Sequence, residues 1–138
     1  MRTSQASLTV ETSGRGLIEI TDRIDRWVDE TGIQTGMLQI FCRHTSASIL
    51  INENAAAAVQ RDLLAWLDRI APEGGHYDHD SEGPDDMPAH IKTLVTGSGL
   101  NVPIGEGRML LGTWQGVFLA EHRQRPHSRR IVLTAIGE

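Results

Sequence analysis

AAAAVQRDLLAWLDRIAP, residues 55–72, carries the clearest helical pattern in the chain and lies near its middle. Its apolar residues follow steps of four, three, one and three, the spacing of one buried helical stripe, and they are Val59, Leu63, Trp66, Leu67 and Ile70. Pro72 ends the run, because proline cannot continue a helix. The stretch predicts a central helix, and the patterns on its two sides decide the fold class.

Strand patterns precede this helix. SLTVET (7–12) alternates apolar and polar residues and GLIEI (16–20) follows a Gly-Arg-Gly turn, so the two predict an opening hairpin. GMLQIFC (36–42) and SASILI (46–51) predict two more strands, joined by a short corner at residues 43–45. The first third of the chain is therefore expected to be rich in β-structure.

Two shorter helices are also predicted. TDRIDRWVDETG (21–32) has Thr21 as its expected N-cap and a buried stripe made of Ile24, Trp27 and Val28. PAHIKTLVTG (88–97) has Pro88 in its first turn and an expected inward face made of Ile91, Leu94 and Val95. The chain is thus expected to contain three helices.

The C-terminal part is again predicted to form strands. They are expected within NVPI (101–104), RMLL (108–111), TWQGVFLAEHR (113–123) and RRIVLTAIG (129–137), with short turns between them. Early strands, central helices and late strands are typical of the α+β class. Since 138 residues is an ordinary size for one domain, a single domain over residues 1–138 is expected.

Composition excludes several classes of partner. The formal net charge of -5 disfavours a nucleic-acid surface, which needs clustered Lys and Arg. No apolar run approaches the roughly 18 residues of a membrane span, and MRTSQASLTVET lacks the apolar core of a signal peptide. The single cysteine, Cys42, cannot form an internal disulfide. A soluble cytoplasmic protein without nucleic-acid or membrane partners is expected.

YDHDSEGPDDMPAH, residues 77–90, concentrates chelating groups in a Pro/Gly-broken stretch. Its carboxylates suit Mg²⁺, and its imidazoles, His79 and His90, suit Zn²⁺ and other transition metals. The spacing matches no established metal motif, so a solvated loop remains an alternative. For Asp85 and Asp86, capping of the following helix is another, because carboxylates favour the positive end of a helix.

Two further segments offer binding groups. His44 stands beside several hydroxyls at a strand corner, and Asn52 and Asn54 follow the next strand, as in an oriented ligand pocket; a structural histidine is the alternative. EHRQRPHSRR (121–130) contains four arginines, which suit phosphate, although a solvated turn would also explain it. In residues 113–123, alternation places Trp114, Phe118 and His122 on one strand face and Gln115, Glu121 and Arg123 on the other.

Taken together, the segments FCRHTSASILINENA, YDHDSEGPDDMPAHIK, GRMLLGTWQGVFLAEHR and SRRIVLTAIGE resemble the YjbQ family of small bacterial and archaeal proteins. The resemblance runs from about residue 5 to residue 138. It implies an α+β fold with a β-sandwich-like mixed sheet, three helices packed outside it, a homotrimer, and pockets at subunit boundaries. It also implies a weak, secondary thiamine-phosphate synthase activity, which joins hydroxymethylpyrimidine diphosphate to thiazole phosphate and releases pyrophosphate.

The resemblance also implies site residues and a divalent metal, Mg²⁺ or Zn²⁺. Catalytic roles fall to Glu82, Asp86 and His44. Metal ligands are His79, His90 and His44, with His122 as an alternative. The ligand-binding set is Ser46, Asn52, Asn54, Trp114, Gln115, Glu121, Arg123, Arg129 and Arg130. Two other functions stay open: a metal-dependent hydrolase of a phosphorylated substrate, and a non-catalytic phospho-ligand binding protein.

Overall fold

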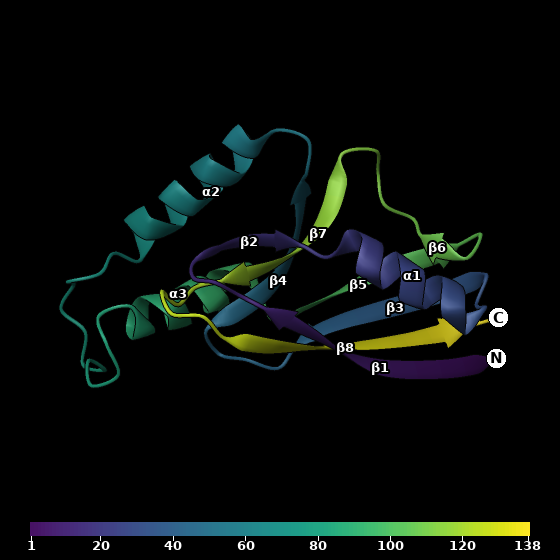
Figure 1. Ribbon diagram of the computed structural model, residues 1–138, viewed down its shortest axis with the longest axis horizontal. Coiled ribbons are helices and arrows are strands. Elements are labelled where there is room, and N and C mark those ends of the chain that lie inside the picture. Colours follow the sequence, from purple (N-terminus) through teal and green to yellow (C-terminus); the bar gives the residue numbers. More distant parts are fainter.

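The computed structural model describes residues 1–138, which form eight strands and three helices (Figure 1). The strands are β1 (Arg2–Glu11), β2 (Gly16–Glu19), β3 (Thr35–Cys42), β4 (Ala47–Glu53), β5 (Gly99–Gly105), β6 (Arg108–Met109), β7 (Gln115–Glu121) and β8 (Ser128–Gly137). The helices are α1 (Thr21–Thr31), α2 (Ala57–Ile70) and α3 (Asp86–Thr96). None of the three is both long and apolar enough to cross a membrane. The predicted α+β class is confirmed.

The strands form two sheets, one with the order β1-β8-β3-β5-β6 and one with the order β2-β7-β4. Every strand pair is antiparallel, so the expectation of a mixed sheet was wrong. Parallel neighbours need a crossover within one sheet. Here both helical connections, α1 and the α2–α3 segment, lead from the three-stranded sheet to the five-stranded sheet.

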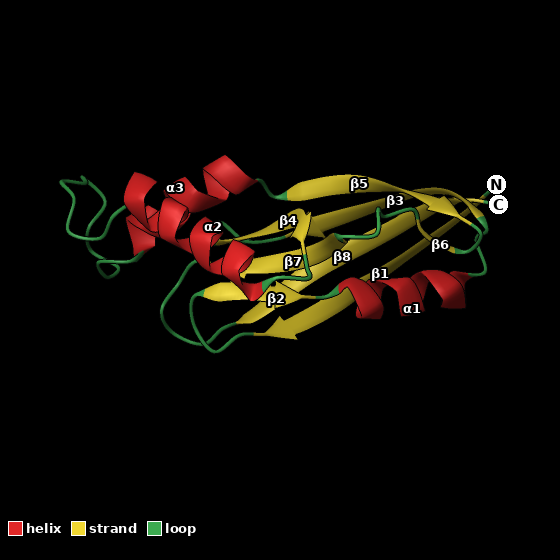
Figure 2. Cartoon of the chain, turned by 90° about the horizontal axis from the view of Figure 1, so that it is seen from above, coloured by secondary structure: helices red, strands yellow, loops and turns green.

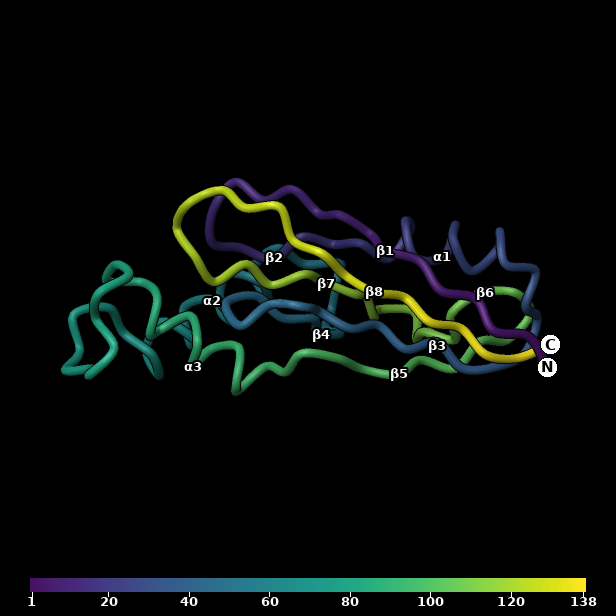
Figure 3. The backbone as a smooth tube through the Cα atoms, turned by 90° about the horizontal axis from the view of Figure 1, so that it is seen from below, coloured from purple at the N-terminus to yellow at the C-terminus, as the bar shows by residue number.

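The opening hairpin was also predicted wrongly. β1 pairs along its whole length with β8, whereas β2 pairs with β7 in the other sheet. Figure 3 shows the first and last strands running side by side, with both chain ends at the same end of the molecule. The turn between β1 and β2 contains Gly14, whose φ of 133° suits glycine and lets the chain change sheets. Alternation identifies a strand, but it does not choose the partner.

Both sheets contribute to a single apolar core of 18 buried residues. β3 buries Leu38, Ile40 and Cys42 in alternation with exposed residues, and the other sheet adds Ile49 and Leu119. Since each sheet buries one face in this shared core, the arrangement is β-sandwich-like. The three helices lie outside the sheets, with α2 and α3 together at one end and α1 alongside the other (Figure 2).

Helix α1 begins where the sequence predicts, but Thr21 does not cap it. The N-cap is Ile20, which has no polar side chain. The Thr21 hydroxyl instead donates to Glu19 and accepts from the Val117 backbone N–H of β7. This hydroxyl is therefore bound to β7 and does not cap the helix. Trp27 is half-buried and packs against the edge of the core.

The apolar stripes of α2 and α3 are less buried than their periodicity predicts. In α2 only Leu67 is buried, and Trp66 is 47% exposed. In α3 the predicted inward face was wrong, because Leu94 is 83% and Val95 50% exposed. The helix instead buries Asp86, Pro88, Ala89, Lys92 and Thr93. Periodicity shows which residues share a stripe, but the polar contacts of this helix decide which face turns inward.

Candidate metal centre and its surroundings

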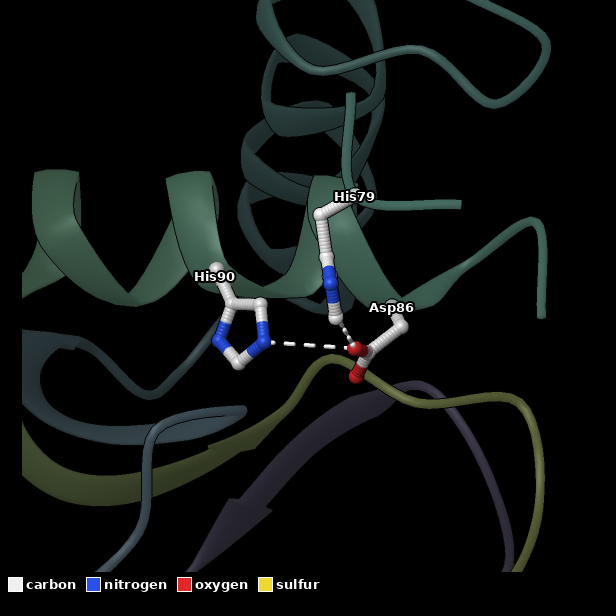
Figure 4. Close-up of side chains that lie close together, drawn as sticks. All are labelled: His79, Asp86 and His90. Atoms are coloured by element: carbon white, nitrogen blue, oxygen red, sulfur yellow. Dashed lines mark hydrogen bonds and ion pairs between the residues drawn. The ribbon is translucent and has the colours of Figure 1, made fainter. Parts of the chain in front are cut away.

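Three chelating side chains meet at the N-terminal end of α3 (Figure 4). Asp86 opens the helix, His90 follows at i+4 on the same face, and His79 approaches from the preceding loop. Asp86 Oδ2 lies 2.7 Å from His79 Nε2 and 3.2 Å from His90 Nε2. One ligand atom from each residue lies within 4.8 Å of the other two, so the structure brings together three residues that the sequence assigned to the site.

The backbone fixes the orientation of the His90 ring. His90 Nδ1 lies 2.9 Å from the Thr45 carbonyl oxygen, which can only accept, so Nδ1 carries a proton and donates. In the neutral ring, Nε2 therefore turns a lone pair toward the Asp86 carboxylate. A histidine held in this way at one nitrogen is the usual arrangement of a metal ligand. Two lone-pair donors facing each other need a positive charge between them, either a proton or a metal ion.

Arg123 holds this cluster against the end of β7. Its Nε lies 3.0 Å from Asp85 Oδ2, its Nη1 2.7 Å from Asp86 Oδ1, and its Nη2 3.0 Å from the Glu82 carbonyl oxygen. Asp85 occupies the N-cap position of α3 and Asp86 lies in its first turn, as the capping alternative expected, but neither side chain makes a capping hydrogen bond. Sequence reasoning left Asp85 out of the site, and the only available signal was its position beside Asp86. Arg123 positions the acidic loop, because its guanidinium already has protein partners.

The cluster residues have shifted pKa values. The hydrogen bond to Asp86 raises the pKa of His79 above 6.5. Burial alone would raise the pKa of Asp86, but His79, His90 and Arg123 outweigh it and hold this pKa below 3.8. Burial would also raise the pKa of Asp85, but the hydrogen bonds from Arg123 and the Gln124 backbone N–H outweigh burial and keep this pKa low. Asp86 is therefore ionised near neutral pH, as a metal ligand must be.

An open cavity of about 310 Å³ lies beside His79. Tyr77, Asp80 and Met87 are among its lining residues. The Glu82 carboxylate lies 3.2 Å from His79 Nε2, and its side chain is 66% exposed. The cluster is thus reachable from solvent on the side where Glu82 stands.

Glu121 and Arg129, two predicted ligand-binding residues, bind each other instead. Both side chains are buried, and the Arg129 guanidinium donates two hydrogen bonds to the Glu121 carboxylate. Thr12 donates to the same carboxylate at 2.7 Å, and Arg129 also reaches the Ser46 hydroxyl at 3.0 Å. This network joins β7 of one sheet to β8 of the other. It occupies both oxygens of the Glu121 carboxylate and makes Ser46 part of the same support.

Neither His44 nor His122 belongs to the His79, Asp86 and His90 cluster. His44 Nε2 accepts a hydrogen bond of 2.8 Å from the Arg130 backbone N–H, and burial, then Arg129, lowers its pKa below 6.5. His122 directly follows β7, is buried and contacts Ser48. Their roles as ligands remain predictions, and the geometry gives both a structural contact.

Four other predicted ligand-binding residues lie at the other end of the three-stranded sheet, whereas Arg130 lies on β8 of the five-stranded sheet. The register pairs Ala47 with Glu121 at one end and Glu53 with Gln115 at the other. Six residue steps at about 3.3 Å separate these ends by roughly 20 Å. The distal set comprises Asn52, Asn54, Trp114 and Gln115, and Asn54 donates there to Glu19. Within one chain, the residues predicted to line one pocket therefore lie in two separate groups.

Thr93 carries the only side-chain oxygen or nitrogen atom that is closed off from solvent and makes no hydrogen bond. Thr93→Val keeps the shape and removes this unsatisfied hydroxyl, so the free energy of unfolding is expected to rise by about 1 kcal/mol. Urea denaturation measures the change. Thr96→Val is the matched control, since the Thr96 hydroxyl bonds Ser48 and the Lys92 carbonyl, and it should lower stability. A loss of stability in Thr93→Val would contradict the assignment.

The fold and this cluster define a small α+β protein with a candidate His-Asp-His metal centre at the start of a helix. The chain belongs to the YjbQ family, since the family model described as UPF0047 protein YjbQ-like matches residues 6–138. The family resemblance seen in the sequence is confirmed.

Relatives and solved structures agree with this assignment. The chain is 46% identical over 138 residues to the UPF0047 protein sll1880 of Synechocystis, covering 99% of this chain and 94% of the relative. It is 42% identical to the UPF0047 protein YjbQ of Escherichia coli O157:H7, with coverage of 97% and 98%. A structure from Clostridium acetobutylicum, of the yjbq/upf0047 family, has a TM-score of 0.88 at 38% identity, covering 95% of this chain and 99% of that chain. A YbjQ-like protein of unknown function from Sulfolobus solfataricus P2 has a TM-score of 0.89 at 26% identity, with coverage of 99% and 100%.

Proposed function

We propose that this chain binds one divalent metal ion through His79, Asp86 and His90 and acts on a small phosphorylated substrate. Weak thiamine-phosphate synthase activity is the first reaction to test. The convergence of the three donor atoms, with His90 held by a backbone carbonyl and Asp86 by Arg123, is the observation that carries the proposal.

The donor set fits a metal ion. Two imidazole nitrogens and one carboxylate oxygen suit Zn²⁺ and related transition metals, whereas Mg²⁺ prefers oxygen ligands alone. The solvent-facing side, next to Glu82, leaves room for a substrate oxygen. A metal ion at this position would supply positive charge that stabilises a diphosphate leaving group.

In the synthase reaction, the bond between the pyrimidine methylene carbon and the diphosphate oxygen breaks, and pyrophosphate leaves with the electron pair. The thiazole nitrogen uses its lone pair to form the new carbon-nitrogen bond. Arg130 is exposed, and its side chain makes no hydrogen bond within the chain, so it is available to contact phosphate. Trp114 is 64% exposed and offers a ring face that can stabilise a developing pyrimidine-methyl cation.

We also propose that the protein is a homotrimer whose pockets lie between subunits. Trp114 and its neighbours lie at the Gln115 end of β7, whereas Arg123, which holds the metal cluster, follows the Glu121 end roughly 20 Å along the strand, so a second subunit would have to complete the pocket. Exposed apolar side chains on α2 and α3, among them Trp66, Ile70, Leu94 and Val95, are of the kind that subunit contacts cover.

The oligomer is tested by light scattering on a size-exclusion column. The expected mass is three times the 15.2 kDa of one chain. Leu94→Glu places a charge on the exposed face of α3 and is expected to lower the mass toward that of one chain. Arg26→Glu, which changes an exposed side chain on α1, is the control and should leave the mass unchanged. A wild-type protein with the mass of one chain would refute the trimer.

The synthase proposal is tested with purified protein and the two phosphorylated precursors, with Mg²⁺, with Zn²⁺, and after metal removal. Thiamine phosphate is expected to form slowly and only with metal. Asp86→Asn should abolish its formation, whereas Asp78→Asn, on the same loop but outside both the cluster and the cavity, should not. His44→Ala tests the second assigned catalytic residue. A rate at background in the wild type, or one unchanged in Asp86→Asn, would reject the synthase assignment.

One observation favours a second candidate, a metal-dependent hydrolase. Two histidines and one carboxylate form a ligand set that is found in catalytic zinc sites, and the Glu82 carboxylate stands beside it, where it could activate water. Release of phosphate from pyrophosphate and from simple phosphate esters tests this reaction. Glu82→Gln should remove it while retaining the metal. Ligand binding without turnover in either assay would instead support a phospho-ligand binding protein.

A further inference from the structure

A second cavity of about 190 Å³ lies between α2, α3 and the end of β7. Lys92, Arg15, Asp68, His122 and Leu64 are among the residues that line it. None of the metal-cluster residues does. Its volume is several times the roughly 30 Å³ of a water molecule, so it can hold a compact group such as a phosphoryl group.

Lys92 is the only lysine in the chain, and it is buried. Its Nζ lies 2.6 Å from Asp68 Oδ1. Arg15 Nη1 lies 3.0 Å from the same oxygen and 3.6 Å from Glu73 Oε1. Two cationic groups therefore converge on one carboxylate oxygen, which is the arrangement that also binds a phosphate oxygen. The buried ammonium uses one of its three N–H donors on a side chain, so two remain.

The Asp68 side chain is a loosely held partner for this buried charge. It is 50% exposed, whereas the Lys92 side chain is 4% exposed. Asp68 also lies on α2, whose only buried residue is Leu67. The carboxylate can therefore turn to solvent when another anion takes its place, whereas the ammonium cannot leave the cavity.

His122 supplies an acceptor in the same cavity. The Thr96 hydroxyl donates to the Lys92 carbonyl, so Ser48 must donate to Thr96, and His122 Nε2 must in turn donate to Ser48. Burial, and then Lys92, lowers the pKa of His122 to about 4, which keeps the ring neutral near pH 7. Its Nδ1 makes no hydrogen bond within the chain and is left as an acceptor. A hydrogen phosphate group offers both oxyanions for the cations and an O–H for this nitrogen.

We propose that this cavity binds the phosphoryl group of a small ligand, with Lys92 and Arg15 holding the oxyanion and Asp68 taking its place when no ligand is bound. Glu121 also lines the cavity, but Arg129 and Thr12 occupy its carboxylate. The site is separate from the metal cluster, so the inference stands whether or not the proposed reaction does. Replacing Lys92 is therefore expected to weaken phosphate binding, whereas replacing its partner Asp68 is expected to strengthen it.

The experiment uses the full-length metal-free protein with lysine labelled at Cε with ¹³C, which gives one lysine signal because the chain has one lysine. Inorganic phosphate and pyrophosphate are expected to shift this signal in a saturable way, whereas chloride at equal ionic strength should not. Asp68→Asn removes the competing carboxylate and should lower the half-saturating concentration about tenfold. A shift with phosphorylated thiazole at lower concentration than with free phosphate would identify a phosphorylated metabolite as the source.

Calorimetry extends the test to variants that lack the signal or the metal site. Lys92→Met should weaken phosphate binding at least about tenfold, and Arg15→Gln should weaken it while leaving the fold intact. Asp86→Asn, which alters the metal cluster and its ion pair with Arg123 but no residue that lines this cavity, should bind phosphate as the wild type does. No saturable shift in the wild type, or an Asp68→Asn variant that binds phosphate no better, would overturn the proposal and leave the ion pair as a structural link between α2 and α3.

Discussion

Arg129→Met is expected to lower the free energy of unfolding by about 3–5 kcal/mol, the largest effect of any single change considered on stability. The substitution leaves the Glu121 carboxylate buried without its counter-ion, and only Thr12 and the Arg123 backbone N–H still donate to it. Urea denaturation near pH 7 measures the loss. Arg130→Met is the matched control, because the neighbouring arginine is exposed on the other face of β8, and its effect should stay within about 0.5 kcal/mol.

The cost of Arg129→Met should also depend on pH. Burial would raise the pKa of Glu121, but the hydrogen bonds from Arg129 and Thr12 outweigh it and keep this pKa below 4.5. A carboxylate whose pKa is lower in the folded state contributes stability that is complete above about pH 4.5 and is lost as the pH falls through its folded value. The difference between wild type and Arg129→Met should therefore shrink below pH 4.5. An equal difference at pH 7 and pH 3 would show that the ion pair does not cause the effect.

Asp86→Asn is expected to weaken zinc binding at least about 100-fold, the largest effect expected on ligand affinity. The variant keeps the shape of the side chain but removes the charge that His79, His90 and Arg123 share. Competition with a chromophoric chelator measures the affinity. Asp80→Asn makes the same charge change in the same loop outside the cluster and should bind zinc as the wild type does.

Asp86→Asn also frees part of Arg123, so the fold must be checked in the same samples. Arg123 keeps Asp85 and the Glu82 carbonyl as partners, and the folded state should therefore survive. His90→Ala provides an independent test, because the His90 side chain is partly exposed and its loss does not disturb an ion pair with Arg123. Zinc affinity that is unchanged in both variants would place the metal elsewhere or nowhere on the chain.

Local patterns predicted much of the secondary structure, because helices and strands here depend on residue spacing. The stripe that begins at Val59 became α2, and the alternation over residues 129–137 became most of β8. Strand partners were not predictable, since β1 pairs with β8 across the whole length of the chain and no local feature encodes that choice. The buried face of α3 was missed for a related reason: Asp86 and Lys92, which decide it, do so through partners far away in the sequence.

The candidate metal centre was predicted in part. Asp86 and His90 are one helical turn apart, so a helix there is enough to place them together. His79 reaches them from a loop, and a loop has no periodic sequence pattern from which its path could be predicted. Arg123 lies at the expected strand end, and Asp85 and Asp86 occupy its donors, so the geometry gives it a positioning role, while its ligand contact stays a prediction.

Anomalous diffraction at the zinc absorption edge, from crystals grown with Zn²⁺, shows whether His79, Asp86 and His90 hold a metal ion. One strong peak is expected in each chain, within bonding distance of His79 Nε2, Asp86 Oδ2 and His90 Nε2, and no such peak is expected in Asp86→Asn crystals. A wild-type map without a peak at this position, or with the only peaks at other side chains, would contradict this metal site.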